Sequence, residues 1–294
     1  MIRAVLSILF LSLLLGKVWA GSKPLIVASI YPLAEIAREI GGEAVEVRLL
    51  LPPGADPHAW EPTPQDILSL KKAELLFAVG GGLEPWLDDL RKGLEIRHLF
   101  LIFPPKTGHS GHGPDPHVWL DFPRDAEISW ALAQKMAQII PDEADLFLKR
   151  GKRLQEKFLR LHRLFQETLA TCRHRTVVLA GHDAFGAWEK NYGLRFCTLA
   201  GQSPEAEPTP KTLRHLIELV KQKGLKAVYY DEPSARRFAE IIAEETGAKV
   251  YYLTPAASPT REELAAGLSF WDFMSRNLKY LSLGLCCQLN IGQI

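Results

Sequence analysis

The sequence has few cysteines and almost no net charge, and these shortages exclude several classes of protein. Its 294 residues include four cysteines, and none are spaced as Cys-x-x-Cys, which excludes a thiolate zinc finger. The formal net charge is +1, so the chain has no electrostatic footprint for nucleic acid or for an anionic membrane. The His-Glu-x-x-His motif of zinc hydrolases is also absent.

The sequence also lacks an apolar run long enough to cross a bilayer. A basic start, Met1-Ile2-Arg3, precedes the nearly unbroken apolar run 4–16, and Val18-Trp19-Ala20 forms a small-x-small cleavage site. This pattern predicts a signal peptide over residues 1–20 and export to the periplasm. Cleavage leaves 33 basic and 34 acidic residues, a charge of −1. Because Gly21 rather than cysteine follows the cut, no lipid anchor is expected.

Apolar and glycine patterns in the first half predict a parallel sheet. A hydrophobic content of 47% and a charged content of 23% are those of a soluble globular protein, and the length suits two domains. Short apolar runs over 23–30, 45–51, 75–79 and 98–103 read as buried strands, with helices between them. Strands that alternate with helices across short turns favour parallel pairing.

The second half repeats this pattern after a long helix. Helices are expected over 124–139 and from Pro141 to about Ala170, the latter with one apolar stripe. Strands follow near 176–179, 194–199, 227–230 and 249–253, and Glu207-Pro208-Thr209-Pro210 repeats the phrase at 61–64. We therefore predict an α/β protein with two lobes, each a mostly parallel sheet flanked by helices, and a helix long enough to cross from one lobe to the other. The expected units are 1–20, 21–140, 141–171 and 172–294.

One five-residue phrase occurs twice in the first half. The copies are Asp56-Pro57-His58-Ala59-Trp60 and Asp115-Pro116-His117-Val118-Trp119. In each, proline stiffens the turn, and a carboxylate stands two residues before an imidazole. A third histidine, His182, follows an apolar run. A lone histidine in a turn more often caps or meets solvent, but three on rigid turns predict a shared metal site, and imidazole suits zinc best.

Two glycine-rich segments each allow two interpretations. Gly80-Gly81-Gly82 lies between a strand and a helix but lacks the Gly-x-Gly-x-x-Gly spacing, so a tight turn is favoured over phosphate binding. The loop 107–113 carries His109 and His112, which either capture metal loosely or belong to a plain flexible loop.

The cysteines lie late in the chain, and an oxidising compartment permits disulfides. Cys172 and Cys197 flank His182 and sit at or in two adjacent apolar runs. They either pair with each other or remain buried free thiols. We assign no role to the adjacent Cys286 and Cys287.

Several motifs resemble one known family. Segments 27–33, 51–64, 82–87, 115–121, 181–185 (Gly-His-Asp-Ala-Phe) and 231–233 look like the metal-specific periplasmic binding proteins of ABC importers, the TroA-like helical-backbone metal receptors. The zinc-uptake branch is the most similar, over residues 23 to 281. The resemblance implies two α/β lobes on one rigid helix, a membrane permease as partner, and Zn²⁺ ligands at His58, His117 and His182. Manganese and iron members carry a carboxylate where His182 stands.

The chain departs from that family at the fourth ligand. The family's usual Asp falls here at Thr254, and a neutral hydroxyl is a poor zinc ligand. The site would then be three histidines plus water, or plus a carboxylate from Asp231 or Glu232, although a structural role for Glu232 is favoured. Carboxylates near the ligands are expected to accept the far N–H of the imidazoles; they are Asp56, Asp115, Asp121 and Asp183.

The predicted function is therefore that of a zinc carrier, monomeric and without catalytic residues. Three alternatives remain open: a manganese or iron(II) carrier of the same family, a three-histidine zinc hydrolase, and a surface adhesin with a structural metal. The absence of a general acid/base motif counts against the hydrolase.

Overall fold

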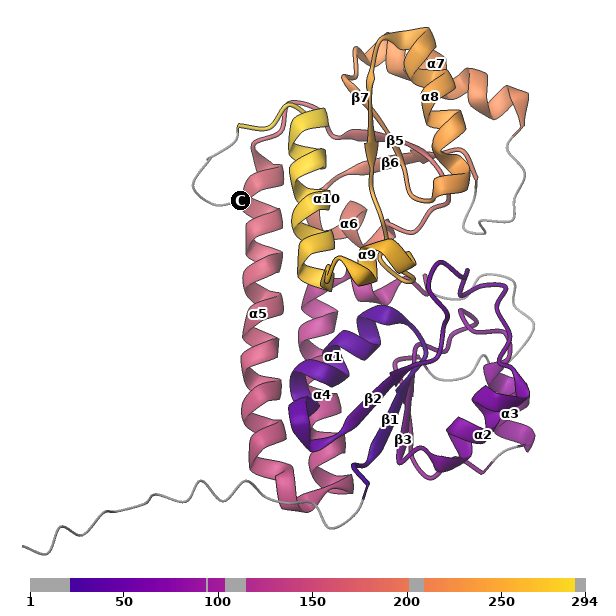
Figure 1. Ribbon diagram of the computed structural model, residues 1–294. Helices are drawn as coiled ribbons and strands as arrows, with labels where there is room; N and C mark the ends of the chain where they lie inside the picture. Colours follow the sequence, from indigo (N-terminus) through magenta and orange to yellow (C-terminus); the bar gives the residue numbers. More distant parts are fainter. Residues whose placement is uncertain (1–21, 94, 104–114, 201–208, 289–294) are drawn as a thin grey trace, which may run out of the picture.

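The first half of the chain folds around a four-stranded parallel sheet. Figure 1 shows the computed structural model, which describes residues 22–93, 95–103, 115–200 and 209–288. The strands β1 (Leu25–Ala28), β2 (Glu46–Leu49), β3 (Leu75–Ala78) and β4 (Leu99–Leu101) lie in the order β2-β1-β3-β4, all parallel. The central strands β1 and β3 are almost wholly buried, which explains their unbroken apolar sequences.

The second half contains a sheet of the same kind. Its strands β5 (Thr176–Ala180), β6 (Arg195–Thr198), β7 (Ala227–Tyr230) and β8 (Lys249–Tyr252) lie in the order β6-β5-β7-β8, again all parallel. Each strand therefore occupies the position of its counterpart in the first sheet. The repeated phrase marks equivalent helix starts, because Thr63 and Thr209 each cap a helix whose first residue is proline.

Helices connect and cover the two sheets. In the first half they are α1 (Tyr31–Gly41), α2 (Pro64–Lys72), α3 (Leu87–Gly93) and α4 (Phe122–Ile139). In the second half they are α6 (Gly186–Tyr192), α7 (Pro210–Lys223), α8 (Arg236–Thr246), α9 (Arg261–Ala265) and α10 (Phe270–Gly284). The last two are separate helices, because Thr260 and Ser269 each begin a helix with a capping box.

The long helix α5 (Ala144–Ala170) runs beside both halves (Figure 1). Its 27 residues span about 40 Å, and a short 3₁₀ turn at Pro141–Glu143 precedes it. One stripe is buried: Phe147, Gly151, Leu154, Phe158, Leu161, Phe165 and Leu169. A methyl group at Gly151 would collide with Ala133 of α4, so glycine permits the close approach of these helices. Among the described residues, no helix is long and apolar enough to cross a membrane.

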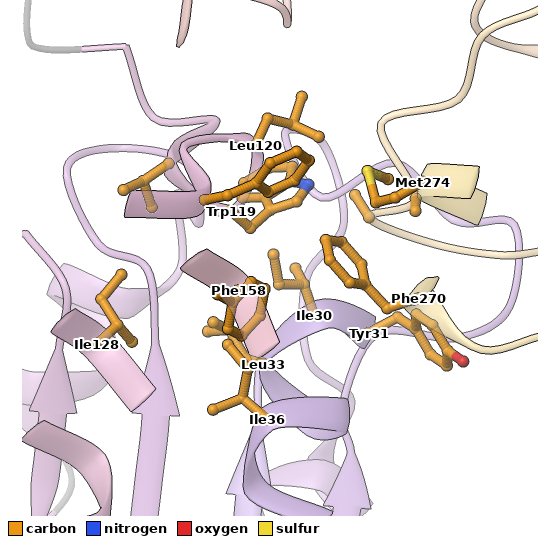
Figure 2. Close-up of a cluster of buried hydrophobic side chains, with 14 of the residues drawn as sticks. Ile30, Tyr31, Leu33, Ile36, Trp119, Leu120, Ile128, Phe158, Phe270 and Met274 are labelled. Carbon is orange, nitrogen blue, oxygen red and sulfur yellow. The ribbon is translucent and has the colours of Figure 1, made fainter. Parts of the chain in front are cut away.

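A buried apolar cluster joins the two halves. Figure 2 shows Trp119, Phe158 and Phe270 within it, from the first half, from α5 and from α10. At its edge, Glu39 Oε1 accepts hydrogen bonds from Lys157 Nζ at 2.8 Å and from Trp271 Nε1 at 2.5 Å. The helix α10 follows the second sheet in sequence but is thus held against α1 and α5. The two halves share one continuous core.

The disulfide joins Cys172 to Cys287, so the pairing of Cys172 with Cys197 is wrong. Cys172 follows α5, and Cys287 follows α10, which brings the chain back to the end of α5. Cys197 packs instead into a separate apolar cluster between the second sheet and α7 and α8, and its thiol is free. Cys172 and Cys197 are close in sequence, but their side chains pack against different apolar clusters.

The Gly80-Gly81-Gly82 segment is a tight turn filled by the protein's own carboxylate. All three glycines have positive φ, of 75°, 62° and 95°. Glu84 accepts hydrogen bonds from the backbone N–H groups of Val79 at 3.0 Å and Gly80 at 2.8 Å, and from the Ser29 hydroxyl at 2.6 Å. These amides are therefore not free to hold a phosphate.

Candidate metal centre

The two Asp-Pro-His phrases form the same kind of turn. Asp56 Oδ1 accepts the backbone N–H of His58 at 2.9 Å, and Asp115 Oδ1 accepts that of His117 at 3.0 Å. An aspartate that bonds the backbone two residues on is a local turn device, and the intervening proline fixes φ. The phrase therefore sets the imidazole position without help from distant residues. Only Asp115 also reaches the ring, 2.8 Å from Nδ1 of His117.

His182 is held by a residue far away in the sequence. It follows β5, and Asp231 follows the neighbouring strand β7. Asp231 Oδ2 accepts the backbone N–H of His182 at 3.0 Å and lies 2.6 Å from its Nδ1, though that ring contact is poorly aligned as a hydrogen bond. The carboxylate packs against Gly181, where any larger residue would collide with it.

The three predicted histidines come together. The Nε2 atom of His117 lies 3.2 Å from that of His58 and 3.3 Å from that of His182. Their ligand atoms all lie within 4.8 Å of one another. A tetrahedral zinc with Zn–N bonds of 2.0–2.1 Å places its nitrogen ligands about 3.3 Å apart. The two separations that involve His117 therefore match neighbouring ligands of one tetrahedral zinc ion, and the third imidazole is within reach of the same ion.

The predicted carboxylate partners divide into those that contact a ligand histidine and those that do not. Asp56 bonds the backbone of His58 rather than its ring, and Asp115 bonds both backbone and ring of His117. Asp121 instead accepts a hydrogen bond from Asn191 at 2.9 Å. Asp183 Oδ1 is buried without a hydrogen-bond partner among the described residues, and burial raises its pKa. Among the described residues, Asp121 bonds Asn191 and Asp183 Oδ1 has no partner, so neither contact orients a ligand imidazole.

Asp231 takes the orienting role that was expected of Asp183. From the sequence, Asp231 is expected only as a possible metal ligand, because its distance along the chain from His182 hides the contact. The available signal was its position directly after a buried strand. Residues at the carboxyl ends of adjacent parallel strands meet at one edge of a sheet.

The fourth coordination position is not filled by a His, Cys, Asp or Glu side chain among the described residues. Thr254 lines the cavity above the imidazoles, but its Oγ1 accepts the backbone N–H of Ala256 at 3.0 Å. The Asn277 side chain accepts the backbone N–H of Thr254 at 3.1 Å and donates to the backbone carbonyl of Thr254 at 2.7 Å. Glu232 also lines the cavity, and its one hydrogen bond in the described structure, from Ser234 at 3.5 Å, is long.

The environment shifts the pKa values of two histidines in opposite directions. Burial and the neighbouring His117 lower the pKa of His58 to about 4, so it is neutral at physiological pH. Burial alone would also lower the pKa of His182, but Asp231, with Glu232 and Asp56 beyond it, leaves that pKa raised. Metal binding at this cluster should therefore release a proton from His182.

Each of the two phrases also ends in a tryptophan. Trp119 is buried beside His117, with ring centroids 5.3 Å apart, and donates its indole N–H to Pro255 at 2.7 Å. Trp60 packs edge-on against Trp86 and does not line the cavity. His109 and His112 lie outside the described residues.

Two parallel sheets beside one long helix, with three converging imidazoles between them, define a two-lobed metal receptor of the α/β class. Residues 26–283 match the family described as zinc-uptake complex component A, periplasmic. The chain belongs to this family. Its sequence is 30% identical over 287 residues to the high-affinity zinc uptake system protein ZnuA of Bacillus subtilis, covering 89% of this chain and 87% of that one.

Two comparisons with streptococcal proteins agree. The zinc-binding lipoprotein AdcA of Streptococcus pneumoniae is 28% identical over 299 residues, which cover 96% of this chain but 60% of that protein. The Zn(II)-bound ZnuA-like domain of the same AdcA matches with a TM-score of 0.78 and 27% identity, over 90% of this chain and 99% of that domain. This chain thus corresponds to one domain of AdcA rather than to its whole length.

Proposed function

We propose that this chain captures Zn²⁺ between its lobes and delivers it to the membrane permease of an ABC importer. The observation that carries the proposal is the convergence of three imidazoles, in which Nε2 of His117 lies 3.2 and 3.3 Å from those of His58 and His182, as in one tetrahedral zinc site. Membership of the zinc-uptake family supports it, as do the similar zinc uptake protein of Bacillus subtilis and the similar Zn(II)-bound domain of AdcA.

The donor set also favours zinc over the alternative metals. Neutral imidazole suits zinc, whereas manganese prefers oxygen ligands. The three clustered donors are nitrogens, and no carboxylate of the described residues joins them. We therefore favour a zinc carrier over a manganese or iron(II) carrier.

The decisive experiment is a metal titration of the purified apo protein against a chromophoric chelator. One tight zinc per chain is expected, with manganese bound more than about a hundredfold more weakly, or roughly 2.7 kcal/mol. Manganese binding within about tenfold of zinc would contradict the zinc assignment. Weak binding of both metals would contradict the receptor function itself.

We propose that water occupies the fourth coordination position, with Glu232 as the candidate that competes with it. Thr254→Asp then adds a charged ligand and should tighten zinc binding, while its carboxylate can still accept the N–H of Ala256. Glu232→Gln should change zinc affinity little. If Thr254→Asp has no effect and Glu232→Gln abolishes binding, Glu232 is the fourth ligand and the water assignment is wrong.

The receptor role implies properties that we propose together. Residues 1–20 form a signal peptide cleaved after Ala20, and the mature protein is a periplasmic monomer without an anchor or catalytic activity. Its units are 21–140, 141–171 and 172–294, although α10 packs on the first half as well. N-terminal sequencing of the exported protein should give Gly21, and a retained apolar segment would refute cleavage.

We propose an accessory role for His109 and His112, which are close in sequence to the second Asp-Pro-His turn. Replacing both with alanine should leave the tight zinc site intact and slow metal capture. Loss of the tight site in this double variant, measured by calorimetry, would make one of them a primary ligand.

A further inference from the structure

The cavity above the three imidazoles is much larger than its metal requires. Its volume is about 310 Å³, and the histidines line one side of it. A water molecule occupies about 30 Å³ in the liquid, so the cavity has room for about ten water-sized groups. A zinc ion with one water needs a small part of that space. Pockets for small organic ligands begin near this size, at about 300 Å³.

Hydrogen bonds between the two halves keep one wall of the cavity in place. The segment 255–259 belongs to the second half, yet it is fastened to the first by four bonds. Trp119 Nε1 donates to Pro255 at 2.7 Å, Tyr31 N to Ala257 at 3.0 Å, Ser258 Oγ to Pro52 at 3.0 Å, and Gly54 N to Pro259 at 3.1 Å. Closing the space over a bound metal would break several of them, so we expect the cavity to remain open.

The charges of the lining limit the kind of molecule that fits. Its carboxylates are Asp56, Asp231 and Glu232, and no Lys or Arg belongs to the described lining. A bound Zn²⁺ offsets part of this negative charge, but a multiply charged anion would add repulsion without a cationic partner. The rest of the wall offers hydroxyl groups for hydrogen bonds, from Ser234, Tyr252, Ser258 and Thr260.

We propose that this protein binds zinc together with one α-amino acid, which occupies the cavity and chelates the metal. The inference rests on the proposed zinc function and names what fills the position left to water. The amino nitrogen and one carboxylate oxygen bond to the zinc and displace that water. The ammonium group releases its proton to solvent as its nitrogen lone pair forms the bond. Zinc then becomes five-coordinate, which it accepts readily.

The ligand's size and charge fit this cavity. The cavity has room for about ten water-sized groups, which is close to the number of non-hydrogen atoms in histidine and about twice the number in glycine. The chelating form carries one negative charge, which the zinc ion more than balances. Citrate is of similar size but carries up to three negative charges, so it should be excluded.

The test is equilibrium dialysis of radiolabelled histidine against the full-length mature protein, with and without one equivalent of zinc. The zinc-loaded protein should retain about one histidine per metal, the apo protein none, and labelled citrate should not be retained. Protein-bound zinc is measured in the same samples. Zinc bound without retained histidine, or zinc removed by histidine, would overturn this inference alone. Failure to bind zinc in amino-acid-free buffer would instead count against the proposed function.

A variant at the cavity wall separates a bound ligand from surface adsorption. Ser258 lines the cavity and bonds no histidine, so Ser258→Phe adds bulk to the cavity, and Ser258→Ala is the matched control because it removes the same bond to Pro52. Histidine retention should fall roughly tenfold or more in the Phe variant and remain in the Ala variant, with zinc binding kept in both. Full retention by Ser258→Phe would overturn the assignment to this cavity.

Discussion

The two halves of this protein share one sheet order, yet they hold their histidines by different means. In the first half, His58 and His117 are set by aspartates two residues away, within one turn each. In the second half, His182 depends on Asp231, 49 residues further along the chain. The first device works wherever the local sequence is intact, whereas the second exists only once β5 and β7 are paired.

The largest expected effect tests whether both halves are needed at once. Replacing His117 or His182 with alanine should weaken zinc binding on the order of a thousandfold, because each removes a ligand from one tetrahedral site. His215→Ala, on the exposed surface of α7, is the control and should bind zinc normally. Chelator competition measures all of these affinities. Retention of tight binding after His182→Ala would show that the first half suffices.

A smaller effect compares the carboxylates that orient the two buried histidines. Asp231→Asn should weaken zinc binding by about 10–100-fold, as loss of the residue that orients a ligand histidine commonly does. Asp115→Asn should cost less, because Asp115 is 32% exposed against 1% for Asp231, and solvent screens its charge.

The control for this comparison is Asp121→Asn, because the Asp121 carboxylate bonds Asn191 and no ligand imidazole, and zinc affinity should be unchanged. Circular dichroism establishes that each variant is folded. Equal losses at Asp115 and Asp231 would remove the distinction between local and long-range support.

The pH dependence of zinc binding should reflect the same contrast. Zinc requires neutral imidazoles, so affinity falls as pH drops through the raised pKa of His182, by about tenfold per pH unit for one proton. His58, with a pKa of about 4, should add a second proton only in stronger acid. Calorimetry in buffers of different ionisation enthalpy counts the protons released. Release of two or more protons per zinc near neutral pH would contradict this assignment.

The smallest expected effect concerns a buried aspartate of the first half. Asp125 is fully buried, and neither of its carboxylate oxygens has a hydrogen-bond partner among the described residues, unlike Asp231. Burial, then the charge of Asp121, raises its pKa well above the usual range. A raised folded-state pKa gives stability that is present below the unfolded pKa and lost as pH rises through the folded one.

Asp125→Asn cannot ionise, so it should stabilise the protein more at pH 8 than at pH 5. The expected rise in Tm at pH 8 is about 2–4 °C, the shift that 1 kcal/mol produces in a chain of this size. Thermal melts at both pH values measure it, and Ser129→Ala on the same helix face controls for helix packing. A lower Tm at pH 8 than at pH 5, relative to the parent protein, would contradict the sign.

The sequence by itself determined the local turns, the helix starts and the order of strands and helices. Alternating buried strands and helices predicted the two parallel sheets, and the apolar stripe predicted a helix from Pro141 to about Ala170, which the structure places at Ala144–Ala170. The Asp-Pro-His phrases identified His58 and His117 because turn chemistry acts within a few residues. The repeated Glu-Pro-Thr-Pro phrase could be recognised for the same reason, and in both copies its threonine caps a helix that begins with proline.

Only the tertiary structure decided which distant groups meet. It paired Cys172 with Cys287, it gave Asp231 rather than Asp183 to His182, and it fastened 255–259 across the cavity. Each contact joins segments far apart in sequence, and its energy is gained only after the intervening chain has folded. Local sequence patterns do not predict such contacts, because the same patterns would be present if the strands had paired in another order.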